Sequence, residues 1–328
     1  MGSSAPFLEI FAKLPAAQSG VPFADFMELA LYHPTVGYYT GPRRRVGRDR
    51  GADFYTATSF NPVFGELVVA AAAELLGPGR AAAHRFVEIG AEPGGGVLRG
   101  IAHPFAGERT VSLGQPIEIA GPCVVFSNEL FDAQPFHSVV FRDGRWRELG
   151  VALADGQLRE TELPAPCPEV AAFADRLPRA APEGYRLDLP LRTVPLLDRI
   201  AGQPWTGLFL AFDYGRSWTQ LVEDFPIGTG RTYSKQRMGG DLLARPGEVD
   251  ITCHICWDWL ADALQRQGFG EAVVESQEAF FARHAAAALA PMMAAEAARF
   301  SPRKQAILQL LHPGNMGQKF QALHALRR

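Results

Sequence analysis

A strand, a glycine-rich turn and a helix are predicted over Val87–Leu98, which reads Val-Glu-Ile-Gly-Ala-Glu-Pro-Gly-Gly-Gly-Val-Leu. Glycines let backbone N–H groups approach a ligand closely, and a helix N-terminus favours an anionic group such as a carboxylate or phosphate. A plain tight turn is the alternative. The dinucleotide-binding pattern G-x-G-x-x-G needs glycine where Glu92 stands. Glu88, just before the turn, favours instead a small cofactor with a cationic amine.

Amide and carboxylate side chains follow two further apolar runs, which we predict to be buried strands. They are Asn128, Glu129 and Asp132 after Cys123–Phe126, and Asp213 after Leu208–Phe212. Open α/β sheets bind ligands at the carboxyl ends of their strands, so these groups could hold a cationic acceptor and orient its lone pair. A helix cap is the alternative, because Ser127 or Asn128 is a good N-cap and acids favour a first helical turn.

The pair Cys253 and Cys256 encloses His254 in a pattern that suggests metal binding. A structural zinc site needs a second ligand pair, and none stands at a suitable spacing. We therefore predict no metal here. His254 could act as a base, or it could be a structural histidine bonded to the turn at Asp250–Thr252.

The helices and strands that must position these groups follow from the spacing of apolar residues and from the glycine and proline residues that interrupt it. A helix is predicted from Pro22 to before Pro34, and another over Val63–Leu76 between Asn61 and Gly77. Phe86–Ile89 is the first strand of a covered sheet. Three antiparallel strands follow later, over Ser138–Phe141, Arg145–Leu149 and Leu158–Glu162, with turns at Asp143-Gly144 and Asp155-Gly156. After them we predict a Pro-rich helical piece over Glu169–Ala201, then a helix (Trp257–Gln267), a strand (Glu271–Ser276) and two helical stretches.

Composition limits the possible partners of the 328-residue chain. Lys and Arg total 32 against 35 Asp and Glu, so no overall positive field attracts nucleic acid. The basic run Arg43–Arg50 is interpreted as a solvated loop. Four cysteines fit a reducing, cytoplasmic setting. The longest apolar stretch, Leu67–Leu76, is too short to insert into a membrane, and Met1–Phe11 does not resemble a secretory signal.

An ordered set of motifs along nearly the whole chain resembles the MidA-like family of S-adenosylmethionine-dependent methyltransferases, whose mitochondrial members methylate protein arginine and help assemble respiratory complex I. The motifs are Phe26-Met27, Leu29 to Pro34, Gly37-Tyr38-Tyr39, Asp53 to Ala57, Pro62 to Leu67, the glycine turn, Asn128-Glu129, Asp132-Ala133, Pro135, Asp213-Tyr214-Gly215, Pro246-Gly247-Glu248, Asp250 to Thr252, His254, Met316-Gly317 and Phe320. Three positions depart from the family pattern: Glu92, Gln236 and Cys256.

The resemblance implies a seven-stranded Rossmann-like class I methyltransferase sheet with S-adenosylmethionine as cofactor and a protein substrate. It divides the chain into an N-terminal helical cap (1–80), a core (81–137 and 205–328) and an inserted α+β lobe (138–204). The implied cofactor-binding residues are Glu88, Gly90, Ala91, Glu92, Gly94 and Asn128. The implied catalytic residues are Asn128, Glu129, Asp132, Asp213 and His254, with Glu129 and Asp132 holding the acceptor guanidinium and Glu88 the methionine amine.

The first half of this sheet must be shortened. A parallel crossover takes about a dozen residues or more, and the stretch between Gly114 and Pro122 has no room for a helix. We expect Thr110–Leu113 and Ile117–Ile119 to be strands joined by tight turns, and neither Glu108 nor Glu118 clearly ends one. Two functions follow: an arginine methyltransferase, or a non-catalytic relative that binds a partner at its acidic edge. A dehydrogenase is a distant third.

Overall fold

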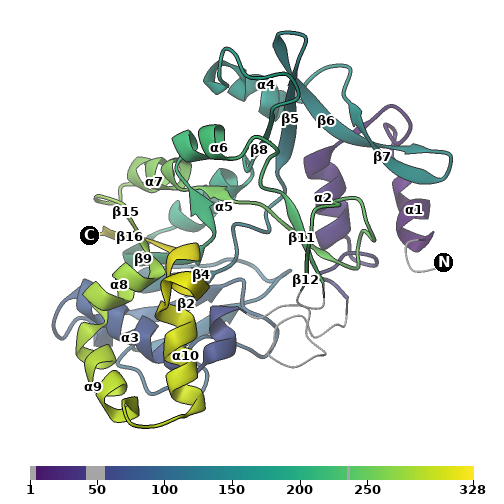
Figure 1. Cartoon of the computed structure of the whole chain (residues 1–328). Helices are drawn as coiled ribbons and strands as arrows, with labels where there is room; N and C mark the ends of the chain where they lie inside the picture. Colours follow the sequence, from purple (N-terminus) through teal and green to yellow (C-terminus); the bar gives the residue numbers. More distant parts are fainter. Residues whose placement is uncertain (1–4, 42–55, 235–236) are drawn as a thin grey trace.

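The computed structural model describes residues 5–41, 56–234 and 237–328 (Figure 1). At its centre is a six-stranded sheet in the order β15-β16-β9-β4-β2-β3. The strands are β2 (Arg85–Ile89), β3 (Gly107–Val111), β4 (Gly121–Asn128), β9 (Trp205–Asp213), β15 (Val273–Ser276) and β16 (Gln321–Arg327). Strands β9, β4, β2 and β3 are parallel, and β16 runs antiparallel to both of its neighbours. The α/β class and the shortened first half are confirmed.

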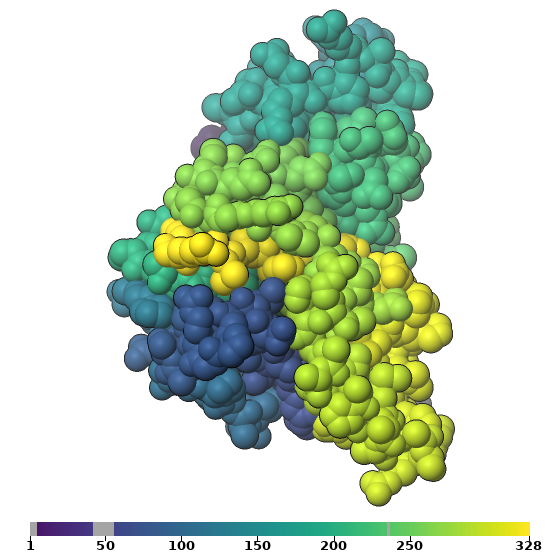
Figure 2. All heavy atoms as spheres, turned by 90° about the vertical axis from the view of Figure 1, so that its left-hand side faces the viewer, coloured from purple at the N-terminus to yellow at the C-terminus, as the bar shows by residue number. Residues whose placement is uncertain are grey.

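Helices cover both faces of this sheet. Successive side chains of a strand point to opposite faces, so Leu208, Leu210 and Phe212 join one apolar cluster while Phe209 and Ala211 join the other. The first cluster includes α3 (Val63–Leu76), α8 (Gln277–His284), α9 (Ala286–Glu296) and α10 (Pro302–Leu311), and the second includes α5 (Thr193–Ala201) and α7 (Trp257–Arg266). In Figure 2 the yellow-green C-terminal helices lie beside the blue segment that contains α3.

Helix α3 begins and ends where the sequence predicts. The Asn61 side chain accepts a hydrogen bond from the Gly65 N–H at 3.1 Å, which satisfies a donor in the first turn. Gly77 ends the helix with a φ of 91°, a conformation that favours glycine. The Asn61 amide also donates to the Val97 carbonyl at 3.1 Å. The start of α3 is therefore tied to the glycine-rich turn.

A second sheet forms the lobe at the top of Figure 1. It contains β1 (Val21–Pro22), β5 (His137–Arg142), β6 (Arg145–Ala154), β7 (Gln157–Glu162) and β8 (Arg186–Leu189), in the order β1-β6-β5-β8 with β7 also paired to β6. The two predicted hairpin turns are present, because Asp143 and Asp155 have φ values of 50° and 53° and a left-handed glycine follows each. Helices α1 (Ala5–Phe11) and α2 (Phe23–Tyr32) pack against this lobe through Phe136 and Val151.

Short elements complete the described chain. They are β10 (Gly215–Arg216) paired with β14 (Ile255–Cys256), β11 (Arg231–Ser234) between β12 (Arg237–Gly239) and β13 (Asp250–Thr252), α4 (Pro168–Phe173), α6 (Trp218–Asp224), the 3-10 turns Ala57–Phe60, Ala81–Ala83 and Ala174–Arg176, and a π turn at Pro313–Gly317. The basic run Arg43–Arg50 and Gln236 lie outside the described residues. Among the described residues, no helix combines the length and apolarity needed to span a membrane.

Some expectations about the elements were wrong. The central sheet has six strands in the described residues, whereas the resemblance implies seven, because the chain between β3 and β4 holds only a loop. Ile117–Ile119 lies in that loop and is not a strand. The predicted helical piece Glu169–Ala201 is interrupted by β8, which pairs with β5 in the lobe.

Candidate functional site

A cavity of about 1210 Å³ opens at the carboxyl ends of β2, β4 and β9. Nine of the predicted site residues line it: Glu88, Gly90, Ala91, Glu92, Gly94, Asn128, Glu129, Asp132 and His254. Asp213, the remaining one, is fully buried beside the cavity and does not line it. The lining also includes residues from the N-terminal segment, from β11 and β13, and from the π turn before β16. Segments far apart in the sequence therefore build one site.

The glycine-rich turn forms one end of this cavity, but no helix follows it. Gly90, Gly94, Gly96 and Gly100 all have positive φ, between 70° and 136°. Only three residues separate the last two of these glycines, which is less than one helical turn. The predicted helix over Val97–Leu98 is thus wrong, and a helix dipole does not contribute to anion binding here.

Instead, the carboxylate of Glu88 organises the turn. Its Oε2 accepts a hydrogen bond from the Val97 N–H at 2.6 Å. A Cβ at Gly96 would lie 3.0 Å from the Thr110 side chain and 3.4 Å from Glu88 Oε2, so glycine allows this close approach. Burial raises the pKa of Glu88 from 4.5 to about 7, although the Val97 N–H opposes the shift. The carboxyl group is therefore near its point of half-ionisation at neutral pH.

Glu129 projects from the end of β4 in a strained conformation. Its φ is 53°, in the left-handed region that side-chain-bearing residues rarely adopt. Its Oε1 accepts a hydrogen bond from the Asn128 amide at 2.9 Å, while Asn128 Oδ1 is buried and has no partner among the described residues. Desolvation in the cavity and the neighbouring Asp132 raise the pKa of Glu129 well above its usual value. No helix follows β4, so the interpretation of Ser127 or Asn128 as an N-cap, with the acids in a first helical turn, is wrong.

Asp132 and Asp213 form the buried base of the acidic end. Asp213 Oδ2 accepts hydrogen bonds from the N–H groups of Phe131, at 2.9 Å, and Asp132, at 3.3 Å. Its Oδ1 accepts from the Tyr214 N–H at 2.8 Å. Asp213 therefore holds the backbone that presents Asp132 to the cavity. Burial raises the pKa of both carboxyl groups, and for Asp132 the charge of Arg231 partly opposes the shift.

Of the cavity residues that were not predicted, four bear on the charge and the aromatic lining of the site. Asp250, Tyr39, Tyr214 and Arg231 face the same space. Tyr39 donates to Asp250 at 3.0 Å, and the Arg231 guanidinium lies 5.2 Å from the Tyr214 ring centre. Tyr39, Tyr214 and Asp250 fall within the motifs that carry the family resemblance, but the resemblance assigned them no role in the site. Arg231 had no signal in the sequence, because only tertiary packing brings β11 to the cavity.

His254 is a poor candidate for a general base. Burial, together with the charges of Arg231 and Arg216, lowers its pKa to about 3. Its backbone N–H donates to the Thr229 hydroxyl at 3.1 Å, and among the described residues its ring makes no hydrogen bond to the Asp250–Thr252 turn. Its Nδ1 is buried without a partner in the described part of the chain. The imidazole is therefore neutral across the physiological pH range.

A family model described as "Putative S-adenosyl-L-methionine-dependent methyltransferase" matches residues 110–273, which is half of the chain. The chain therefore belongs to this family of S-adenosylmethionine-dependent methyltransferases. No curated protein matches the chain.

Two solved structures from Burkholderia thailandensis resemble the whole fold. One is described as a COG1565 superfamily member and likely methyl transferase bound to S-adenosyl-homocysteine. It is 25% identical, with a TM-score of 0.85, over 99% of this chain and 92% of that chain. The other is described as an uncharacterized protein of the same superfamily. It is 24% identical, with a TM-score of 0.82 and the same coverage of both chains. The family match supports the predicted cofactor and favours a methyltransferase over a non-catalytic relative.

Proposed function

We propose that this protein transfers the methyl group of S-adenosylmethionine to protein arginine, as the MidA-like resemblance implies. The observation that carries the proposal is the convergence of three carboxyl groups, from Glu129, Asp132 and Asp250, in a cavity that the glycine turn also lines. Arginine is charged at all physiological pH values, so an enzyme that methylates it must hold the cation with acids.

The residues present fit the cofactor. The turn provides a close backbone approach that a Cβ at Gly96 would obstruct, and Glu88 provides a carboxylate for the methionine ammonium group. Asn128 Oδ1 is a buried acceptor without a partner in the described structure, which a ligand donor would satisfy. We assign Glu92 to the ribose hydroxyl groups, because Glu108 lies near the start of β3, opposite Phe86, and cannot reach the cavity end of its strand.

At the acceptor end, Glu129 and Asp132 orient the guanidinium, and Tyr39 and Tyr214 supply aromatic faces. When bound, the cofactor supplies a sulfonium-activated methyl group. Glu129, whose pKa is raised by burial and by Asp132, would accept the proton that the guanidinium nitrogen releases on methylation. The positive charge of Arg231 repels the acceptor guanidinium near Asp132, so the acceptor lies closer to Glu129.

The remaining expectations stay proposals. We retain the division into a cap (1–80), a core (81–137 and 205–328) and a lobe (138–204), although α3 of the first segment packs on the central sheet. We also retain a protein substrate and a cytoplasmic location. Positioning and electrostatics would supply most of the catalysis in such an enzyme.

Two measurements test the function. Calorimetry with S-adenosylmethionine should detect binding to the full chain, and the absence of heat at millimolar ligand would refute the enzyme. Transfer of a labelled methyl group to Arg-rich protein acceptors should then yield methylarginine by mass spectrometry. Glu129→Gln should keep cofactor binding and lose at least about 100-fold in transfer rate, the usual scale of general acid–base effects.

The matched control is Glu118→Gln, which changes an exposed acid outside the cavity and should leave transfer unaltered. Full transfer by Glu129→Gln would contradict the catalytic assignment. Methylation of lysine or another residue in place of arginine would contradict the substrate.

A further inference from the structure

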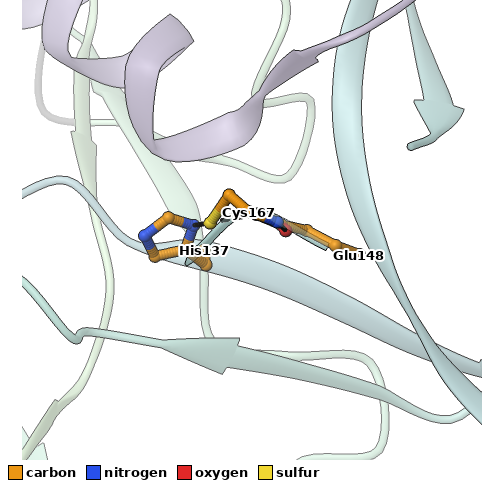
Figure 3. Close-up of side chains that lie close together, drawn as sticks. All are labelled: His137, Glu148 and Cys167. Atoms are coloured by element: carbon orange, nitrogen blue, oxygen red, sulfur yellow. Dashed lines mark hydrogen bonds and ion pairs between the residues drawn. The ribbon is translucent and has the colours of Figure 1, made fainter. Parts of the chain in front are cut away.

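Three side chains that can bind metal converge in the lobe, and none of them lines the cavity. His137 is the first residue of β5, Glu148 lies on β6, and Cys167 precedes α4 (Figure 3). One ligand atom from each lies within 4.8 Å of the other two. His137 and Glu148 are buried, with side-chain exposures of 1% and 0%, and Cys167 is half-buried. None of the three has a part in the proposed methyl transfer.

Their spacing is close to that of a tetrahedral zinc site. Zn–S and Zn–N bonds of about 2.3 and 2.0 Å at a tetrahedral angle separate sulfur from nitrogen by about 3.5 Å. The Cys167 sulfur lies 3.6 Å from His137 Nδ1. Two ligands with bonds of about 2.0 Å lie about 3.3 Å apart, and Glu148 Oε1 lies 2.9 Å from the same Nδ1. A shift of a few tenths of an ångström in the carboxylate would admit the ion.

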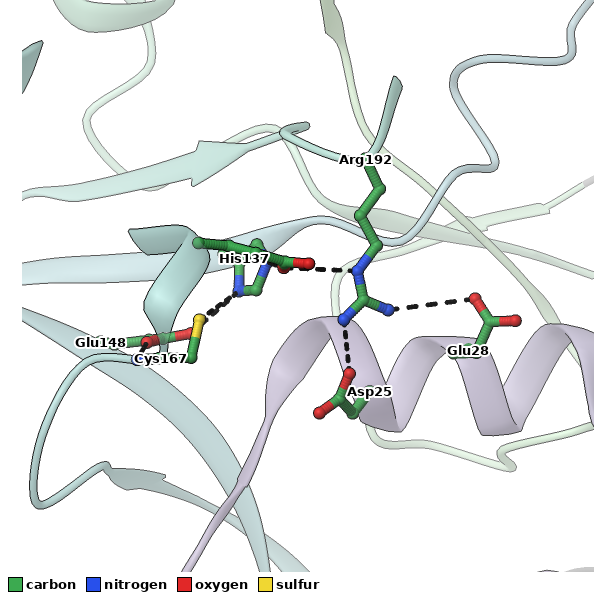
Figure 4. A network of polar contacts seen from close by, with 7 residues as sticks. Asp25, Glu28, His137, Glu148, Cys167 and Arg192 are labelled. Atoms are coloured by element: carbon green, nitrogen blue, oxygen red, sulfur yellow. Dashed lines mark hydrogen bonds and ion pairs between the residues drawn. The ribbon is translucent and has the colours of Figure 1, made fainter. Parts of the chain in front are cut away.

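A second observation also favours a metal site: the groups that contact the three candidate ligands are arranged as they are in known metal sites. Metal-binding histidines usually donate their other ring N–H to a carboxylate, and His137 Nε2 contacts Glu169. The second oxygen of Glu148 accepts the Cys167 N–H at 2.6 Å. Arg192 contacts Glu169 at 3.4 Å and reaches Asp25 and Glu28 of α2 (Figure 4).

We propose that His137 Nδ1, Glu148 Oε1 and Cys167 Sγ form a site for Zn²⁺ or a similar thiophilic divalent ion. Metal binding requires an unprotonated Nδ1 and a thiolate at Sγ, so any proton on these two atoms passes to solvent. The carboxylate and the thiolate then balance the two positive charges of the ion. Three protein ligands leave the fourth position for water. The site joins β5, β6 and the chain before α4. Arg192 extends this connection to α2, whose Tyr32 hydroxyl donates to the Ala133 carbonyl, next to Asp132 of the cavity lining.

Cobalt is the sharpest probe, because a Co²⁺–thiolate bond gives a charge-transfer absorption that oxygen and nitrogen ligands do not. The full chain, stripped with a chelator, should bind one Co²⁺ with this absorption, and Zn²⁺ should abolish it by displacement. Metal should also raise the melting temperature. Glu169→Gln should weaken binding about 10-fold to 100-fold, the usual effect of losing such a supporting carboxylate.

Cys167→Ser should abolish the absorption, and the matched control Cys123→Ser, in the apolar core, should keep it. A second group of candidate ligands, Glu275, His284 and His324, has no sulfur and already pairs with Arg283. Metal binding without the thiolate absorption, lost in His284→Asn, would therefore place the ion there and overturn the proposal. So would an absorption that persists in Cys167→Ser, or no binding by a chain that is folded by circular dichroism.

Discussion

Replacing Glu88 with glutamine should make the unliganded protein more stable at neutral pH and lower its affinity for the cofactor. Glu88 is 6% exposed, and its burial raises its pKa from 4.5 to about 7. Between these two pH values the folded protein holds a proton on Glu88 that the unfolded chain has lost. Stability therefore falls as pH rises through this window, and the loss is complete above about pH 7.

The magnitude follows from the pKa. A rise from 4.5 to about 7, at about 1.36 kcal/mol for each pKa unit, corresponds to a loss of about 3 kcal/mol. Glu88→Gln keeps an oxygen that can accept the Val97 N–H and removes the ionisation. Other acids with raised pKa values, such as Asp132 and Asp213, are common to both proteins and cancel in the difference. The variant should match the wild type near pH 4.5 and exceed it by up to about 3 kcal/mol at pH 8.

Urea unfolding of the unliganded wild type and variant, at intervals from pH 5 to 8, measures this difference. If the free energies of unfolding of wild type and variant changed with pH in the same way, the argument would be refuted, since Glu88 would then have the same pKa in the folded and the unfolded chain. Calorimetry with S-adenosylmethionine at pH 8 tests the role of Glu88 in cofactor binding. If Glu88 binds the methionine amine, the variant should lose at least about 10-fold in affinity, which corresponds to about 1.4 kcal/mol. Unchanged affinity would remove Glu88 from the cofactor site.

Three smaller changes test other parts of the site. Gly96→Ala should lower both cofactor affinity and stability, because Gly96 has a φ of 136° and its Cβ would approach the Thr110 side chain. Calorimetry measures the affinity and thermal melting the stability. The control Gly114→Ala should lose only stability, because Gly114 has a φ of 82° and open surroundings. Asp213→Asn should cost about 1–3 kcal/mol in urea unfolding, because an amide N–H₂ would face backbone donors. His254→Gln should leave the shape of the pH–rate profile unchanged between about pH 5 and 8, since its pKa of about 3 lies outside that range; loss of a limb near pH 6.5 would show that it titrates there.

Local signals predicted much of the fold. Apolar runs bounded by glycine and proline gave β2, β4 and β9, because strands covered on both faces are apolar throughout. The Asp-Gly turns gave the hairpins of the lobe through their left-handed conformation. Strand β16 was not predicted, because Gln321, His324 and Arg327 interrupt its apolar pattern, although the strand pairs with β9 along its whole length. Its place depends on partners far away in the sequence.

The helix expected after the glycine turn failed for a related reason. Val97 and Leu98 are apolar and would suit a helix, yet they are buried in the cluster that also holds α3. Glycines on both sides, with φ values of 136° and 73°, leave no room for a helical turn. Local pattern could identify the ligand-binding turn but not the conformation that tertiary packing gives it.

The same limit explains which half of the site was predictable. Glu88, Asn128 and Glu129 end strands, and strand order brings such ends together at one edge. Asp250 and Arg231 reach the cavity only because β13 and β11 fold back over it. These two residues carry opposite charges, and Arg231 sits beside Asp132, whose pKa it lowers against the effect of burial. The balance of charge at the acceptor end is thus set by a strand that sequence reasoning could not place, so the choice of acceptor depends on β11 as much as on the acids.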